Sequence, residues 1–238
     1  MTETATIAER IAHLRQRIDT LTVQSGRAAG SVTLLPVSKT FGADAVREAM
    51  AAGLQRFGEN KVQEIREKSA QLAATRVQWI MIGHLQTNKA KDVARYAHEI
   101  QSLDRPDLAL ALQRRLELEV RSMTALVQVK TSNEPSKFGL DPLELEDFLH
   151  FLARETPALR VQGLMTMAVN DSDPDAVRAC FRRLRELGDS MRQKSIPGVT
   201  LERLSMGMSG DYALAIEEGS TEVRIGSAIF GDRGYTSA

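Results

Sequence analysis

A lysine that directly follows an apolar run is the first residue whose position suggests chemistry. Residues Val32–Val37 are apolar and rich in β-formers, so they predict a strand, and Ser38 and Lys39 follow at its end. Partial shielding from water disfavours the charged form of a lysine, and the neutral amine can condense with an aldehyde. The alternative is an ordinary solvated lysine at a strand end. The position of Lys39 taken alone favours this alternative.

Small and hydroxyl-bearing residues gather in two segments near the end of the chain. One is Leu204–Asp211, and the other is Gly219–Ser227, which ends in Gly226 and Ser227. Free backbone N–H groups and hydroxyls in such segments can bind an anion such as phosphate. Either segment alone could simply turn the chain. Their positions after the last two predicted strands favour a phosphate site.

Arg224 lies inside the last predicted strand, Glu222–Ile225. Because side chains alternate along a strand, Arg224 points away from the side taken by Val223 and Ile225, and therefore inward if those two pack on helices. If the bound ligand had a pyridine ring, an arginine facing the ring nitrogen could only donate a hydrogen bond to it. That nitrogen would then stay unprotonated, and the ring would be a poor electron sink. An ion pair with a carboxylate at the rim is the alternative, and the sequence leaves both open.

Eight short apolar runs alternate with helical patterns along the chain. An amphipathic helix spans Ile7–Leu21, and Asp141-Pro142 and Asp173-Pro174 each predict a helix start. The alternation predicts an α/β fold, a single (β/α)8 TIM barrel with an extra N-terminal helix, over one domain of residues 1–238. A doubly wound open sheet is the competing architecture. The predicted strands are Val32–Val37, Gln55–Gly58, Val77–Ile82, Glu99–Ser102, Thr124–Val129, Arg160–Met165, Thr200–Leu204 and Glu222–Ile225.

A barrel would bring the two ends of the chain together at one rim. The last strand pairs with the first, so Lys39 would stand beside Gly226 and Ser227 at the carboxyl ends of the strands, where barrels carry their sites. An amine next to a phosphate cradle suits a phosphorylated aldehyde. Pyridoxal 5'-phosphate is the cofactor that fits this description.

Other polar residues at predicted strand ends have simpler interpretations. Asn60 and Asn88 could hydrogen-bond a ring substituent, but both are also good helix-start residues, and the residues alone favour capping. His84 is interpreted as a rim or packing histidine, because no second ligand at metal-binding spacing accompanies it. Cys180 falls on the apolar stripe of a predicted helix and is interpreted as structural.

Composition excludes several classes of protein. The 31 basic and 31 acidic residues balance, and aromatic residues make up 5% of the chain, so neither nucleic acid nor an acidic membrane is the expected partner. One cysteine cannot form an internal disulfide, which suits a reducing compartment. Since the N-terminal segment carries charges rather than an apolar run, we expect a cytoplasmic protein.

Five blocks of the sequence resemble the pyridoxal phosphate homeostasis protein family, in the family's order. The resemblance implies a barrel of the alanine racemase N-terminal type (pyridoxal phosphate fold type III without the C-terminal β-domain) with the cofactor on a lysine. It implies that Lys39 is that lysine, that Ser205, Gly226 and Ser227 contact the phosphate, that Arg224 lies near the cofactor and that Asn60 lies in the pocket. The blocks are Pro36–Thr40, Gly58–Asn60, Ile82–Lys89, Leu204–Ser209 and Val223–Gly231.

The resemblance favours a carrier of pyridoxal phosphate over an enzyme. A racemase needs a second base on the opposite face, which related racemases take from an additional β-domain. Twelve residues follow Gly226, and Tyr235 is a poorly placed substitute for that base. We therefore expect a homeostasis protein that holds the cofactor as a lysine Schiff base and buffers it or delivers it to apo-enzymes. The alternatives are a weak racemase or a cofactor-sensing interaction protein; we expect a monomer, with a dimer as the other arrangement.

Overall fold

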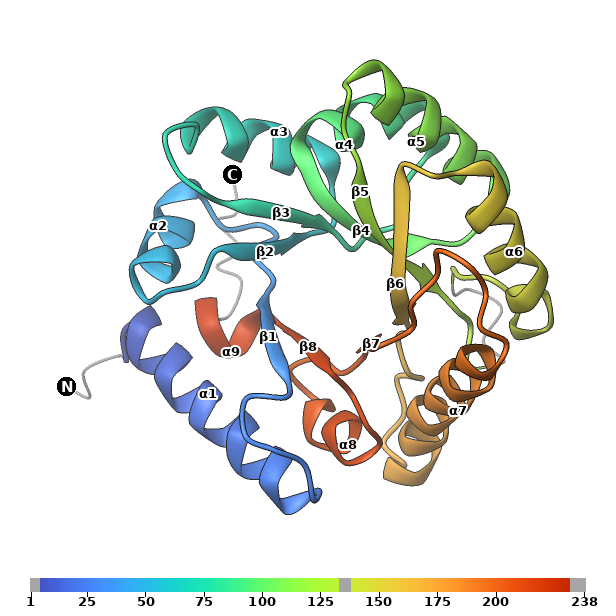
Figure 1. Ribbon diagram of the computed structural model, residues 1–238. Helices are drawn as coiled ribbons and strands as arrows, with labels where there is room; N and C mark the ends of the chain where they lie inside the picture. The colour runs from blue at the N-terminus through green and yellow to red at the C-terminus, as the bar shows by residue number, and fades with distance from the viewer. Residues whose placement is uncertain (1–4, 133–137, 232–238) are drawn as a thin grey trace.

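The strands form one parallel sheet that curls into a barrel. The computed structural model describes residues 5–132 and 138–231. Eight strands in this part of the chain stand as a ring with the helices outside it (Figure 1). The predicted barrel is therefore confirmed over the open sheet. The strands are β1 (Thr33–Pro36), β2 (Arg56–Glu59), β3 (Gln78–Met81), β4 (Ala97–Leu103), β5 (Met123–Gln128), β6 (Leu159–Met165), β7 (Arg203–Ser205) and β8 (Glu222–Ile225).

Helices connect successive strands and cover the outside of the ring. Asp173 accepts a hydrogen bond from the N–H of Asp175 and caps the long helix α7, as the Asp-Pro pair predicts. Asp141 likewise caps the turn η2 (Pro142–Glu144) that leads into α6. The helices are α1 (Ile7–Gln24), α2 (Ala43–Ala51), α3 (Val62–Gln71), α4 (Ala90–Tyr96) after the turn η1 (Thr87–Lys89), α5 (Pro106–Leu118), α6 (Leu145–Glu155), α7 (Pro174–Gln193), α8 (Tyr212–Glu217) and α9 (Ser227–Phe230).

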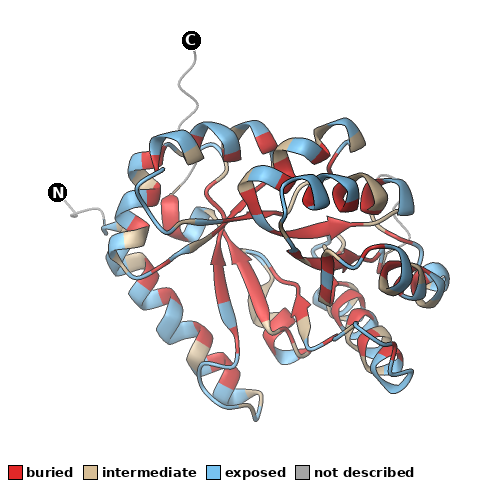
Figure 2. Ribbon diagram, turned by 45° about the horizontal axis from the view of Figure 1, so that its top comes forward, coloured by how far each residue is buried: buried red, intermediate tan, exposed pale blue. Residues whose placement is uncertain are grey.

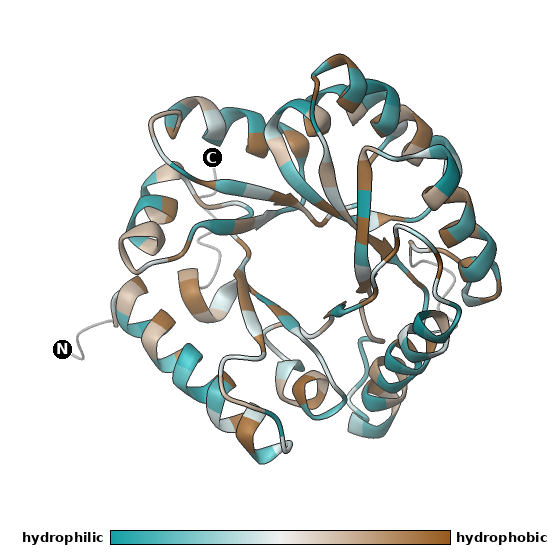
Figure 3. Ribbon diagram, viewed as in Figure 1, coloured by the Kyte–Doolittle hydropathy of each residue, from teal (hydrophilic) through white to brown (hydrophobic). Residues whose placement is uncertain are grey.

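The hydrophobic core lies between the strands and the helices. Figure 2 shows the strands as almost wholly buried, whereas the helices alternate buried and exposed residues. Hydrophobic and hydrophilic residues alternate in the same way along the long helices (Figure 3). On α7 the buried positions include Val177, Cys180, Phe181 and Leu184, the stripe expected of an amphipathic helix. Cys180 is a core residue, as predicted.

The barrel joins its first and last strands. β1 pairs with β8 in parallel, with Pro36 opposite Ile225. α1 then packs on α8 and α9, and Arg27 donates to the carbonyl oxygens of Ser220 (2.7 Å) and Ile216 (2.6 Å). The ladder order runs from β1 through β8 back to β2, and a bridge between Val37 and Gly58 links β1 to β2 at their carboxyl ends. The two ends of the chain are therefore held together.

Candidate functional site

A cavity of about 580 Å³ opens at the carboxyl ends of the strands. Five of the six predicted site residues line it: Lys39, Asn60, Arg224, Gly226 and Ser227. The remaining wall is mainly apolar, which is usual for small-molecule sites. It comprises Val37, Phe41, Ile82, Gly83, His84, Gln128, Phe138, Met165, Met167, Met208, Ser209, Gly210 and Gly231.

A second cavity of about 450 Å³ lies at the opposite end of the barrel, between α1 and the starts of β1, β2 and β3. Arg15, Asp19 and Arg56 supply its charged lining, and none of the predicted site residues reaches it. Since barrels carry their sites at the carboxyl ends of the strands, the first cavity is the candidate site.

Lys39 stands where the first strand meets the last. The N–H of Val37 donates to the carbonyl of Ile225 (2.8 Å), which fixes the chain two residues before Lys39. Lys39 is half-buried and shares the cavity wall with Gly226 and Ser227. Lys39 and the Gly226–Ser227 segment therefore lie together at the cavity, as predicted.

Arg224 points into the barrel and is buried. Its guanidinium donates to Ser205 Oγ (2.9 Å) and to the carbonyl oxygen of Thr166 (2.8 Å). These two hydrogen bonds end on neutral oxygens rather than on the rim carboxylate of the alternative interpretation. Burial lowers the pKa of Arg224 to about 10, so the side chain stays charged at neutral pH. The cavity thus has one wall that is cationic and donates hydrogen bonds.

Ser205 lies beneath the cavity rather than in its wall. Its side chain is fully buried, and Oγ donates to Oε1 of Gln101 (2.8 Å) while accepting from Arg224. Ser209, four residues further along, lines the cavity instead. Gly207 makes the turn between the two serines with φ of 96°, and a Cβ there would lie 2.6 Å from Ala215 Cβ. The phosphate contact assigned to Ser205 stays a prediction, and Ser209 is the better-placed hydroxyl.

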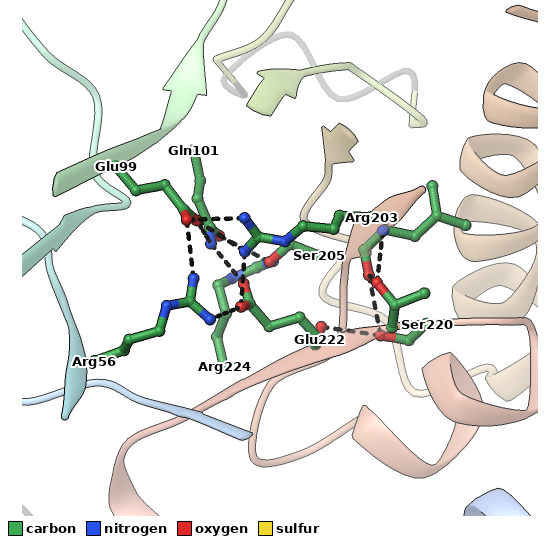
Figure 4. A network of polar contacts seen from close by, with 10 residues as sticks. Arg56, Glu99, Gln101, Arg203, Ser205, Ser220, Glu222 and Arg224 are labelled. Atoms are coloured by element: carbon green, nitrogen blue, oxygen red, sulfur yellow. Dashed lines mark hydrogen bonds and ion pairs between the residues drawn. The ribbon is translucent and has the colours of Figure 1, made fainter. Parts of the chain in front are cut away.

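Paired charges from β2, β4, β7 and β8 form a layer inside the barrel, next to Arg224 (Figure 4). Arg203 donates to both oxygens of Glu99 (2.8 and 2.9 Å) and to Glu222 (2.9 Å), and Arg56 bridges the same two carboxylates. Burial opposes ionisation of Glu222, but the neighbouring Arg56 and Arg203 outweigh it, so the pKa of Glu222 lies below its ordinary value. No pattern in the sequence predicts this layer.

Gln101 connects the charged layer to the cavity. Its Nε2 donates to Glu99 (2.7 Å) and Glu222 (2.5 Å), and its Oε1 accepts from Ser205. The hydrogen bonds therefore run from the carboxylates through Gln101 and Ser205 to Arg224 (Figure 4). Because every member is buried and hydrogen-bonded, this chain fixes the orientation of the guanidinium.

Asn60 lines the cavity, and Gly83 holds it there. A Cβ on Gly83 would lie 2.2 Å from the carbonyl oxygen of Asn60, so only glycine permits this approach. The capping role favoured for Asn60 is wrong, because Lys61 is the N-cap of α3. Capping is also wrong for Asn88, which lies inside η1 and faces a different, smaller cavity beside α4 and α5.

Aromatic rings flank the cavity mouth. The rings of His84 and Phe138 stack with centroids 3.8 Å apart, and those of Phe41 and Phe230 stack at 5.2 Å. His84 is thus a rim histidine in contact with an aromatic residue, as predicted. Tyr235, considered above as a substitute for the second base, lies outside the described residues.

Two negative findings apply to residues 5–132 and 138–231. None of the helices there combines the length and the apolar character that crossing a membrane requires. The same part of the chain has no group of three or more His, Cys, Asp or Glu residues arranged to hold a metal ion.

Comparison with known proteins points to one family. The family profile described as "Alanine racemase, N-terminal domain" matches residues 10–234. The pyridoxal phosphate homeostasis protein of Vibrio cholerae is 40% identical over 237 residues, covering 97% of this chain and 98% of that protein. The corresponding Pseudomonas aeruginosa protein is 41% identical, covering 97% of each chain.

A solved structure agrees along the whole barrel. PipY of Synechococcus elongatus, in a structure with PLP bound, is 36% identical with a TM-score of 0.84, covering 95% of this chain and all of that one. Alanine racemase of Corynebacterium glutamicum, at 17% identity and a TM-score of 0.65, shares the fold; 97% of this chain matches 62% of that enzyme.

Proposed function

Because the chain belongs to the pyridoxal phosphate homeostasis protein family, we propose that it binds pyridoxal 5'-phosphate on Lys39 and buffers or delivers it. The observation that carries the proposal is the shared cavity of Lys39, Arg224, Gly226 and Ser227, which come from opposite ends of the chain. An amine, a guanidinium and small residues with free backbone donors are the groups that an aldehyde, a pyridine ring and a phosphate require.

The cavity fits that cofactor in size and in chemistry. Its volume of about 580 Å³ is in the normal range for small-molecule sites. The hydroxyl side chains of Ser209 and Ser227 and the backbone around Gly226 can donate to phosphate oxygens. Met165, Met167 and Ile82 supply apolar surface for a ring. Arg224 uses two of its five N–H groups in the contacts described, and its side chain also lines the cavity.

Lys39 and Arg224 have different proposed roles toward the bound cofactor. When bound, pyridoxal phosphate supplies an aldehyde that accepts an amine. Lys39 would hold the cofactor by condensing its amine with that aldehyde, with loss of water, and another amine could replace Lys39 by exchange, with no net oxidation or reduction. Arg224 can donate to the pyridine nitrogen but not protonate it at neutral pH, which disfavours carbanion chemistry. This division suits storage and delivery.

Borohydride reduction tests the proposal directly. We expect protein saturated with pyridoxal phosphate and then reduced to carry one pyridoxyl group, which peptide mass mapping places on Lys39. Reduction converts the exchangeable C=N bond to a stable amine, so the adduct survives digestion. An adduct on another lysine, or none in saturated protein, would remove the basis of the proposal.

Arg224→Gln is expected to weaken cofactor binding roughly tenfold or more, because a charged hydrogen bond contributes about 1.5–3 kcal/mol. Equilibrium titration with pyridoxal phosphate measures the change. Arg160→Gln is the matched control, since Arg160 is the second residue of β6 and is exposed. Equal affinity of the Arg224 variant and the wild-type protein would show that Arg224 makes no useful contact with the cofactor.

We extend the proposal to the wider context of the protein. Residues 1–238 act as a single domain and as a monomer in the cytoplasm, and apo-enzymes that use pyridoxal phosphate receive the cofactor. Sedimentation of the loaded and unloaded protein tests the monomer. Transfer to a purified apo-enzyme, followed by recovery of that enzyme's activity, tests delivery.

A further inference from the structure

A second lysine, Lys68 on α3, lies buried behind Lys39. Its Nζ donates to the carbonyl oxygen of Ser38 (2.9 Å), to Glu59 Oε1 (2.6 Å) and to Glu64 Oε2 (3.0 Å). These three bonds use the full donor capacity of an ammonium group. A buried lysine is costly unless it is fully paired, so its position calls for a reason beyond packing.

The partners of Lys68 hold the backbone on both sides of Lys39. On one side, Ser38 accepts from Lys68 through its carbonyl and donates from Oγ to Glu59 Oε1 (2.6 Å). On the other side, the N–H of Thr40 donates to Glu64 Oε2 (2.8 Å). One cluster of charges thus holds the residue before Lys39 and the residue after it.

Thr40 shows that this segment is constrained. Its φ of 71° lies in the left-handed region, which a β-branched residue adopts only when its surroundings require it. The hydrogen bond to Glu64 holds the Thr40 amide in that conformation. The turn directs the chain, and with it the Lys39 side chain, at the cavity mouth.

The cluster also closes the barrel between β1 and β2. Val37 and Gly58 form a bridge there, and the N–H of Ser38 donates to the carbonyl of Gly58 (3.1 Å). Glu59 on β2 and Lys68 on α3 continue the contact one residue further along. The Lys39 segment therefore depends on this junction for its position.

The charge state of the cluster responds to pH near neutrality. Glu59 is fully buried, and its Oε2 has no hydrogen-bond partner in the described residues. Burial raises the pKa of Glu59 to about 7, against the attraction of Lys68. Burial also opposes ionisation of Glu64, but hydrogen bonds from Thr40 and Lys68 outweigh it, so the pKa of Glu64 is lowered. The charged groups that face Glu59 are Lys68 and Glu64 from α3, with the Ser38 hydroxyl from β1.

We propose that Lys68, together with Glu59 and Glu64, is a positioning group that holds Ser38 and Thr40 and so aims the amine of Lys39 at the bound aldehyde. This inference rests on the proposed function, in which Lys39 carries the cofactor. Lys68 itself does not touch the cofactor. Lys68 instead raises the fraction of bound cofactor that is held covalently on Lys39 rather than as free aldehyde.

Lys68→Met is the principal test, with two readouts. In cofactor-free protein we expect amide hydrogen exchange at Ser38 and Thr40 to accelerate tenfold or more. Without the hydrogen bonds of Lys68, the free energy needed to open this segment locally is lower. In cofactor-saturated protein we expect the ratio of Schiff base to free aldehyde, read by absorbance, to fall roughly tenfold, since small displacements of a reacting group have effects of this size or larger. Lys68→Arg should restore part of both.

Arg121→Met is the matched control. Arg121 also grips backbone carbonyls, those of Ala94, Arg95 and Ala97, but at the start of β4. We expect it to lower stability without changing either readout at Lys39. If Lys68→Met is too unstable to purify, Glu59→Gln serves instead. Its Schiff-base fraction relative to wild type should then change between roughly pH 6 and pH 8, where Glu59 titrates.

The outcomes separate this inference from the proposed function. Wild-type protein that forms no adduct on Lys39 contradicts the proposed function, whatever the exchange data show. Wild-type protein that loads normally, with a Lys68 variant of equal Schiff-base fraction and equal exchange at Ser38 and Thr40, contradicts the positioning role alone.

Discussion

Lys39→Ala is expected to abolish the borohydride-stable adduct and to weaken pyridoxal phosphate binding about 100-fold, which corresponds to about 3 kcal/mol. The variant loses the amine that forms the covalent bond, while Arg224, Gly226 and Ser227 still line the cavity. Residual binding should therefore be non-covalent and lack the Schiff-base absorbance. Fluorescence or absorbance titration with mass spectrometry of the reduced protein measures both effects.

Lys91→Ala is the control, because Lys91 is exposed on α4 and lies outside the cavity. It should bind and reduce like the wild type. Unchanged affinity in the Lys39 variant would contradict the assignment of Lys39. Racemisation of an amino acid that depends on Lys39 and reaches the usual enzyme range of about 1–1,000 per second would contradict the carrier role instead.

Glu222→Gln is expected to lower the free energy of unfolding by about 3 kcal/mol or more, because breaking a buried ion pair leaves an uncompensated charge. Glu222 accepts from Arg56, Arg203 and Gln101, and its side chain is 1% exposed. Denaturant unfolding measures the loss. The same variant should weaken cofactor binding, since Gln101 and Ser205 link this carboxylate to Arg224.

The pH dependence of stability identifies the cause. The pKa of Glu222 is lower in the folded protein than its ordinary value of 4.5, so its contribution is present above that pH and is lost as the pH falls through the folded value. Glu222→Gln should therefore cost less in acid than at neutral pH. Glu202→Gln, at an exposed position before β7, should change stability by less than about 0.5 kcal/mol at either pH. Equal losses at both pH values would exclude the ion pairs as the source.

Local patterns in the sequence are sufficient to predict the barrel. Alternating apolar runs and the Asp173-Pro174 start signal depend on neighbours in the chain, so they can be read without the tertiary structure. The short elements are predicted less accurately. Strand β7 is predicted at Thr200–Leu204 but occupies Arg203–Ser205, and the single helical turn α9 is missed because four residues carry no periodicity.

The site was predictable only in part, because local patterns do not show which residues from distant parts of the chain come into contact. The strand-end position of Lys39 and the alternation around Arg224 made both residues candidates, and the resemblance to the family selected them; both line the cavity. Which of Ser205 and Ser209 lines the cavity depends on the turn at Gly207 and its packing against α8, and the sequence pattern does not show this packing. Lys68 and Gln101 look like ordinary helix and strand residues until distant strands bring their partners to them.

The pairing of β1 with β8 has a consequence for the protein while it is being made. Lys39 leaves the ribosome well before Arg224, Gly226 and Ser227, which come much later in the chain. Until β8 emerges, β1 lacks its strand partner, and the carbonyl oxygens of Ser220 and Ile216 that receive Arg27 are not yet in place. A growing chain therefore has no complete cavity until β8 has emerged, and loading with the proposed cofactor reports that this strand is in place.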